Sequence, residues 1–156
     1  MYYSSVSHLL TKALKFEKKV GILTMVIIYT TPSNRPSREA VQWFKRHNVP
    51  FTERRITQHD RLSVKTLKRL IAASEDGVDS ILARRSTSLK SISGVDAMSL
   101  NDLLQMMSLD SHLIHFPLIF DDERNLLVTH GQEELGVFIS HKERIAEMRA
   151  LLRSHG

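Results

Sequence analysis

The stretch MVIIYTTPSNRPSREAVQWF, residues 25–44, decides the fold. Its first part, 25–30, is an apolar and β-branched run that predicts a buried strand ending before Pro32. The segment 37–47 predicts a helix with an apolar inner face, capped by Ser33 or Asn34. A buried strand that turns directly into an amphipathic helix indicates an α/β fold.

The turn between this strand and this helix is where thioredoxin-like folds carry a redox C-x-x-C motif. Asn34 and Ser37 occupy the two cysteine positions, and the whole chain contains no cysteine. Disulfides, thiol catalysis and thiolate metal sites are therefore excluded. We interpret Ser37 as a capping serine at the start of the helix, because the motif places no base beside its hydroxyl group.

The pattern downstream of this turn completes an α/β plan. The helix is expected to end at Asn48 and Pro50, and 51–56 predicts a short strand parallel to the first one. Further along the chain we expect a helix over 64–74 capped by Ser63, a short helix after Gly77, a loop over 87–98, a helix starting at Ser99, a hairpin over 118–129 and a helix over 132–153. The prediction is a thioredoxin-like fold, β-α-β, helical insert, β-β-α, with a four-stranded mixed sheet.

Length and charge set the domain organisation. The chain has 156 residues, a net charge of +5 and an ordinary 42% of hydrophobic residues, which suits one globular domain. Residues 1–24 hold four lysines against Glu17, and the remainder is nearly balanced. We expect 1–24 to be an N-terminal extension, disordered or a mis-assigned start before Met25, although an amphipathic targeting helix is an alternative. Residues 25–156 then form the single domain.

Several functions are disfavoured by the same sequence. No run of about 18 apolar residues is present, so no membrane span is expected. The weak charge of the domain, with no helix-turn-helix and no basic stripe, argues against independent sequence-specific DNA binding.

Four segments in register resemble the Spx regulators, a branch of the arsenate reductase (ArsC)-like family. They are VIIYTTPSNRPSREAVQWFKRHNVPF, ASEDGVDSILARRS, MSLNDLLQMM and HFPLIFDDERNLLV, within Met25 to Leu152. The second is similar to the family segment T-E-D-G-x-D-x-I-x-x-R-S. In this family a cysteine attacks arsenate or forms a redox switch, and Spx proteins bind the C-terminal domain of the RNA polymerase α subunit.

The resemblance also indicates which site residues are missing. Asn34 stands at the nucleophile position and has no thiolate, so arsenate reduction and disulfide switching are both excluded there. Phe116 stands where a basic residue normally precedes Pro117, and a phenyl ring cannot clamp an oxyanion. Pro117 matches a proline that is usually cis in thioredoxin-like folds. His130 has no nucleophile or metal cluster near it in sequence, and we interpret it as a surface or turn histidine.

By the same resemblance, the segment that binds the partner is retained more fully than the redox site. The resemblance implies that Glu75, Asp76, Gly77 and Arg85 contact the partner. Gly77 is also expected to be a left-handed helix C-cap that leaves a bare patch of backbone.

The expected function is therefore that of a cytoplasmic, monomeric Spx-like regulator that binds RNA polymerase and lacks the redox switch. We expect no enzyme activity, no cofactor and no metal site. Two alternatives remain: a catalytically inactive arsenate reductase-like scaffold, and a decayed homologue without polymerase binding.

Overall fold

The sheet has four strands in the order β2-β1-β3-β4. A computed structural model describes residues 26–129 and 134–155, so the predictions for 1–24, Met25, His130 and the start of the last helix lie outside the described residues. Strand β1 (Val26–Thr30) runs parallel to β2 (Thr52–Arg55) and antiparallel to β3 (Leu118–Asp121), which pairs antiparallel with β4 (Leu126–Val128). The mixed four-stranded sheet predicted from the sequence is confirmed.

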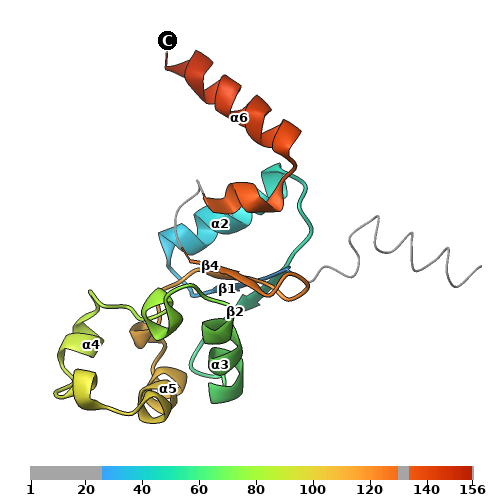
Figure 1. Cartoon of the computed structure of the whole chain (residues 1–156). Helices are drawn as coiled ribbons and strands as arrows, with labels where there is room; N and C mark the ends of the chain where they lie inside the picture. Colours follow the sequence, from blue (N-terminus) through green and yellow to red (C-terminus); the bar gives the residue numbers. More distant parts are fainter. Residues whose placement is uncertain (1–25, 130–133, 156) are drawn as a thin grey trace, which may run out of the picture.

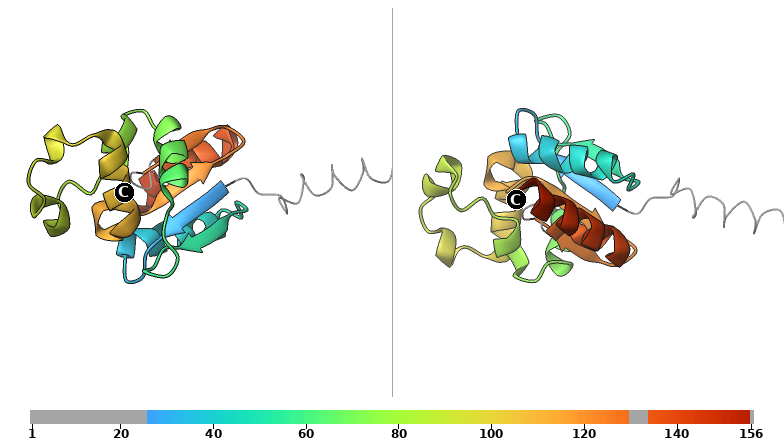
Figure 2. Two further views of the ribbon diagram at one scale, coloured as in Figure 1. Left: turned by 90° about the horizontal axis from the view of Figure 1, so that it is seen from below. Right: turned by 90° about the horizontal axis from the view of Figure 1, so that it is seen from above.

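Helices cover both faces of this sheet (Figures 1 and 2). On one face lie α2 (Arg35–Arg46) and the short 3-10 helix η4 (Glu134–Phe138); on the other lie α3 (Val64–Ala72), α4 (Thr87–Lys90) and α5 (Leu100–Leu109). Each face has its own apolar core. Ile28 and Phe44 belong to the core on the α2 side, whereas Leu67, Leu104 and Phe120 belong to the core on the insert side. Because β1 and β3 are covered on both faces, they are apolar almost throughout.

The insert is more helical than the sequence predicts. Residues 87–98 were expected to be a loop, but they contain α4 and the 3-10 helix η2 (Val95–Ala97). Ser86 caps α4, since its hydroxyl accepts a hydrogen bond from the amide of Leu89 at 3.1 Å. Gly94 precedes η2 with a left-handed φ of 73°. Both helices are too short for periodicity to reveal them, and Leu89 is buried.

The C-terminal segment differs from the expected single helix. The described part of it consists of η4 and then α6 (His141–Ser154), which starts anew at Ser140. A capping box separates the two: the Ser140 hydroxyl accepts from the Glu143 amide at 3.2 Å, and the Glu143 carboxylate accepts from the Ser140 amide at 2.8 Å. No residue of α6 is buried, and the helix projects from the body of the molecule (Figure 1).

Candidate functional site

The two positions of the lost redox motif lie together in the first turn of α2. Asn34 is the N-cap residue, and its side-chain oxygen accepts a hydrogen bond from the Ser37 amide at 2.8 Å. The interpretation of Ser37 as the capping serine is wrong, because Ser37 already lies inside the helix and donates to the cap. Asn34 therefore has a structural role, in which its amide satisfies one of the free N–H groups of the helix terminus.

The Ser37 hydroxyl is buried without a partner. The residue is 2% exposed, and its oxygen makes no hydrogen bond to the described part of the chain. A buried polar atom in this state loses its hydration without compensation. Ser37 is thus the position where a second cysteine, a less polar side chain, would fit the surroundings better.

Ser37→Ala is expected to preserve or raise the free energy of unfolding, by up to about 1 kcal/mol, because no hydrogen bond is lost. Thr30→Val is the matched control. Thr30 is equally buried, but its hydroxyl donates to Glu53 at 2.9 Å, so its removal is expected to cost about 1 kcal/mol. Urea denaturation followed by circular dichroism measures both. A destabilised Ser37→Ala variant would mean that the hydroxyl has a partner in solution.

A cavity of about 480 Å³ opens beside Asn34. It is lined by Thr31, Pro32, Ser33, Asn34, Ile56, Thr57, Gln58, Ser111, His112, Ile114 and Phe116. No lysine or arginine is among these described lining residues. Recognition of a multiply charged oxyanion relies on such cations, above all on arginine. The described lining of the cavity thus lacks the lysine and arginine side chains that usually hold such an anion.

Phe116 lines this cavity but is mainly a core residue. It is 5% exposed and packs in the core cluster on the insert side. The peptide bond between Phe116 and Pro117 is cis, as expected for the position before β3. Arg85 does not line the cavity beside Asn34; it is exposed on the segment that follows η1 (Gly77–Ser80). The structure thus does not bring Arg85 and Asn34 together in one site.

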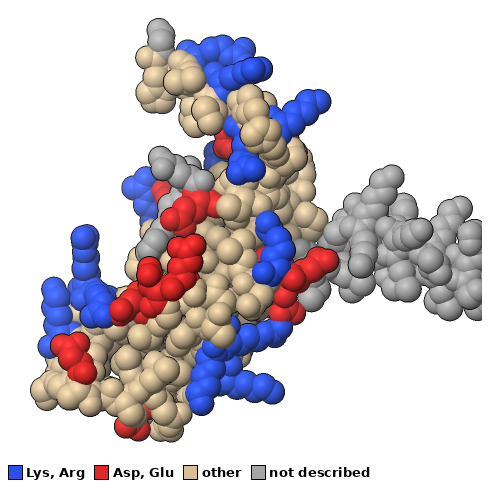
Figure 3. Space-filling view, in the orientation of Figure 1, with Lys and Arg blue, Asp and Glu red and all other residues tan. Residues whose placement is uncertain are grey.

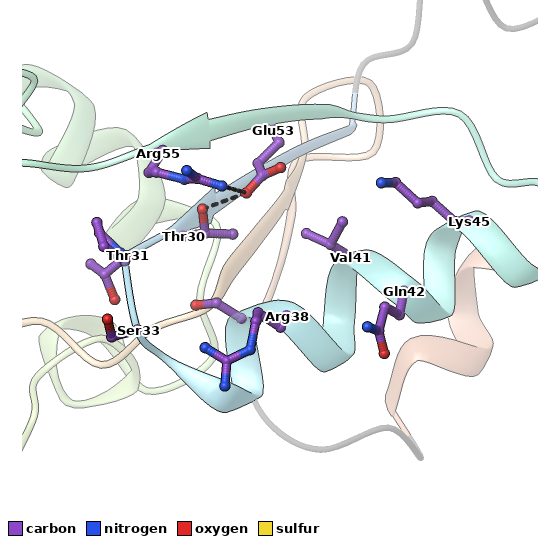
Figure 4. A pocket seen from close by; sticks show the side chains of 11 residues that line it. Thr30, Thr31, Ser33, Arg38, Val41, Gln42, Lys45, Glu53 and Arg55 are labelled. Carbon is purple, nitrogen blue, oxygen red and sulfur yellow. Dashed lines mark hydrogen bonds and ion pairs between the residues drawn. The ribbon is translucent and has the colours of Figure 1, made fainter.

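A second cavity, of about 350 Å³, lies on the other side of the same turn (Figure 4). Arg38 and Lys45 from α2 and Glu53 and Arg55 from β2 line it, and Glu53 lies 3.8 Å from Arg55. The sequence pattern alone does not indicate that these four charged residues lie together. The alternation in 51–56 places Glu53 and Arg55 on one face of the strand, but only the packing of α2 shows which helix residues join them.

Gly77 has the backbone conformation expected of it, but at a different place in the fold. Its φ is +62°, and a Cβ atom built on it would meet nothing within 4 Å. The predicted helix C-cap is wrong, since α3 ends at Ala72 and Gly77 begins η1. The Ser74 hydroxyl lies 2.6 Å from the Ile71 carbonyl and 3.0 Å from the Gly77 carbonyl, and so ties the turn to the end of α3.

The side chains around Gly77 are open to solvent. Glu75, Asp76 and Arg85 are all exposed. An ion pair between Arg84 and Asp79 links η1 to the following segment. The turn therefore presents two carboxylates and a patch of uncovered backbone, while Arg85 stands on the chain beyond η1.

Four groups of the described chain have a shifted pKa. Burial raises the pKa of Tyr29, an effect that the Arg54 and Arg69 guanidiniums partly offset. The hydrogen bond between Arg54 and Asp60 raises the pKa of Arg54 and lowers that of Asp60. Hydrogen bonds from Ser140 lower the pKa of Glu143. None of these groups lines the cavity beside Asn34.

The described ranges, 26–129 and 134–155, hold neither a metal-binding cluster nor a membrane-spanning helix. No three His, Asp or Glu side chains of those ranges gather as a metal centre would require. No helix in the same ranges has both the length and the apolar character needed to cross a membrane.

Comparison with known proteins identifies relatives along most of the chain. The ArsC family model matches residues 29–138. The global transcriptional regulator Spx of Bacillus subtilis (strain 168) is 33% identical over 130 residues, which cover 83% of this chain and 98% of that protein. The protein of the same name from Staphylococcus aureus (strain NCTC 8325 / PS 47) is 30% identical with the same coverage.

Solved structures share the fold at lower sequence identity. An ArsC family-related protein from Bacteroides fragilis superimposes with a TM-score of 0.65 and 19% identity, covering 74% of this chain and 98% of that one. Arsenate reductase from Vibrio cholerae gives a TM-score of 0.60 and 22% identity, covering 74% and 99%. These likenesses confirm the predicted thioredoxin-like architecture.

Proposed function

The chain belongs to the ArsC family, within it to the branch of the Spx regulators, and from that premise we propose that it regulates transcription by binding the C-terminal domain of the RNA polymerase α subunit. The regulation would have no redox switch, since the chain has no cysteine. A protein that binds RNA polymerase acts in the same compartment as the polymerase, so we propose that this chain is cytoplasmic. We also propose that it acts as a monomer.

The observation that carries this proposal is the open turn at Gly77. A Cβ atom added at Gly77 would meet nothing within 4 Å, and Glu75 and Asp76 beside it are exposed. A partner can therefore approach the main chain closely and meet carboxylates at the rim, as in a protein interface with a buried centre and a polar edge. We propose that Glu75, Asp76 and Gly77 form the contact and that Arg85 extends it.

An enzymatic role is disfavoured by the cavity beside Asn34. Its described lining holds no thiol, lysine or arginine, and Phe116 contributes an apolar ring. The decayed-homologue alternative rests on the loss of the basic residue at Phe116. The Phe116 side chain is buried in the core. The missing basic residue at this position is therefore compatible with an intact turn at Gly77.

A pull-down with the isolated polymerase α C-terminal domain tests the proposal directly. We expect the full chain to be retained by the immobilised domain and to be released by an excess of free domain. Absence of binding, with the chain shown to be folded, would favour the decayed homologue.

Binding is expected to be insensitive to thiol oxidants, because the chain can form neither a disulfide nor a sulfenic acid. Affinity for the polymerase domain should be the same before and after diamide treatment when the partner's own thiols are blocked. The six methionines are the remaining oxidisable side chains, so mass spectrometry must show them unmodified. A change in affinity under these conditions would contradict the proposed loss of the redox switch.

A further inference from the structure

A groove of about 900 Å³ lies between α2 and α6, on the face of the sheet opposite the Gly77 turn. From α6 it is lined by Arg144, Glu147, Met148 and Leu151, which share one side of a helix at the spacing i, i+3, i+4 and i+7. Met148 and Leu151 are 60% and 58% exposed. Apolar side chains of α6 thus line an open groove.

His47 links α2 to α6 beside this groove. Its imidazole stacks on the Trp43 ring with centroids 4.0 Å apart, and its nitrogens reach the Trp43 carbonyl at 2.8 Å and the Glu147 carboxylate at 3.1 Å. Trp43 is buried but lines the groove beside His47. The contact between His47 and Glu147 joins residues 100 positions apart and connects α2 to α6 beside the groove.

The charged side chains at the groove differ in whether they have a hydrogen-bond or ion-pair partner among the described residues. Glu147 is engaged by His47, and Glu143, nearby on the same helix, is engaged by the Ser140 amide. The side chains of Arg46 and Arg144, by contrast, make no hydrogen bond or ion pair to the described residues, although the Arg144 stem packs over Gly136. Lysine and arginine also gather over α6 on the surface (Figure 3). The groove therefore offers two available guanidiniums beside exposed apolar side chains.

We propose that this groove binds an acidic amphipathic helix of a partner protein. A helix that enters a groove between two helices is held by apolar anchors at i, i+3 or i+4 and i+7, which match the stripe of Met148 and Leu151. Flanking carboxylates would pair with Arg46 and Arg144, since a guanidinium binds a carboxylate in bidentate geometry. A flat bilayer does not fit a recess between helices, and a nucleic acid does not match its apolar lining.

The test uses the full chain and a synthetic helical peptide whose leucines recur at i, i+3, i+4 and i+7 and whose other positions are mostly glutamate. Fluorescence anisotropy is expected to show binding that weakens with added salt. A peptide with lysine in place of each glutamate should bind at least about tenfold more weakly. Failure of the acidic peptide to bind, or equal binding of the two peptides, would overturn the proposal.

Variants locate the site. Leu151→Glu should weaken binding of the acidic peptide at least about tenfold, whereas Leu109→Glu is the matched control, because Leu109 is 68% exposed on α5 across the sheet. Arg46→Gln with Arg144→Gln should weaken binding and flatten its salt dependence, and Lys65→Gln on α3 should do neither. Gly77→Arg should leave the peptide affinity unchanged, which separates this surface from the polymerase contact.

Other occupants would give different results. Sedimentation in which Leu151→Glu converts a dimer to a monomer would assign the groove to a second copy of the chain and overturn the proposal. Tighter binding to phosphatidylserine vesicles or to duplex DNA than to the acidic peptide, lost in Leu151→Glu, would overturn it as well.

Discussion

Gly77→Arg is expected to abolish binding to the polymerase α C-terminal domain while the protein remains folded. Any residue other than glycine at a φ of +62° costs on the order of 1 kcal/mol. A typical domain has about 5–15 kcal/mol of stability, so this strain alone does not unfold it. A Cβ atom at this position would also meet nothing within 4 Å in the chain. What the side chain blocks is the close approach of a partner.

The magnitude follows from the size of an ordinary interface. About 800 Å² per partner is buried in a standard protein contact, and its central residues dominate the affinity. A long cation at that centre has to be desolvated or displaced, so we expect a loss of binding of more than about a hundredfold, equivalent to about 2.7 kcal/mol. Isothermal titration calorimetry measures the affinity, and circular dichroism checks the fold.

Two smaller substitutions separate backbone strain from steric block. Gly77→Ala keeps the strain and adds little bulk, and Gly77→Asn adds a modest side chain that tolerates the left-handed region. Both are expected to bind measurably. If Gly77→Arg bound as well as the unmodified chain, Gly77 would have a conformational role only, and the contact surface would lie elsewhere.

Asn34→Cys combined with Ser37→Cys is expected to form a disulfide on oxidation. The Asn34 side chain already reaches the Ser37 amide at 2.8 Å across the first turn of α2, so the two side chains start from neighbouring positions. A disulfide needs Cα atoms about 4.4–6.8 Å apart, which residues three apart in a helical turn satisfy. Mass spectrometry with thiol labelling should detect loss of both free thiols.

The single variants provide the controls, since neither can form an intramolecular disulfide. Recovery of only free thiols from the oxidised double variant would mean that the motif is misplaced. Arsenate reduction should not return in the reduced double variant. The cavity beside position 34 has no lining lysine or arginine to hold the oxyanion, and the ring of Phe116 occupies one wall.

The candidate site was only partly predictable. The absence of cysteine is a property of the sequence, and it excluded thiol chemistry, including disulfide switching, without any structure. That Gly77 requires a left-handed backbone was also predicted correctly. The sequence did not reveal that Arg85 lies away from the cavity beside Asn34, or that this cavity lacks cations, because both depend on how distant segments pack.

The sequence by itself determined the elements whose signals lie within a few neighbouring residues. The apolar run before Pro32 specified β1, the caps Ser63 and Ser99 specified α3 and α5, and Pro117 marked the start of β3. Caps, turns and periodicity act between residues up to about four positions apart, so they can be recognised along the chain.

Only the tertiary structure decided which of these surfaces are covered. The apolar residues of α6 have the spacing of a buried face, yet Met148, Leu151 and Leu152 remain exposed because the helix restarts at Ser140 and projects from the body. The contact of His47 with Glu147 spans 100 positions and has no local signature. Burial depends on the packing of elements far apart in sequence. A local pattern indicates which side chains favour burial, but it does not indicate which element buries them.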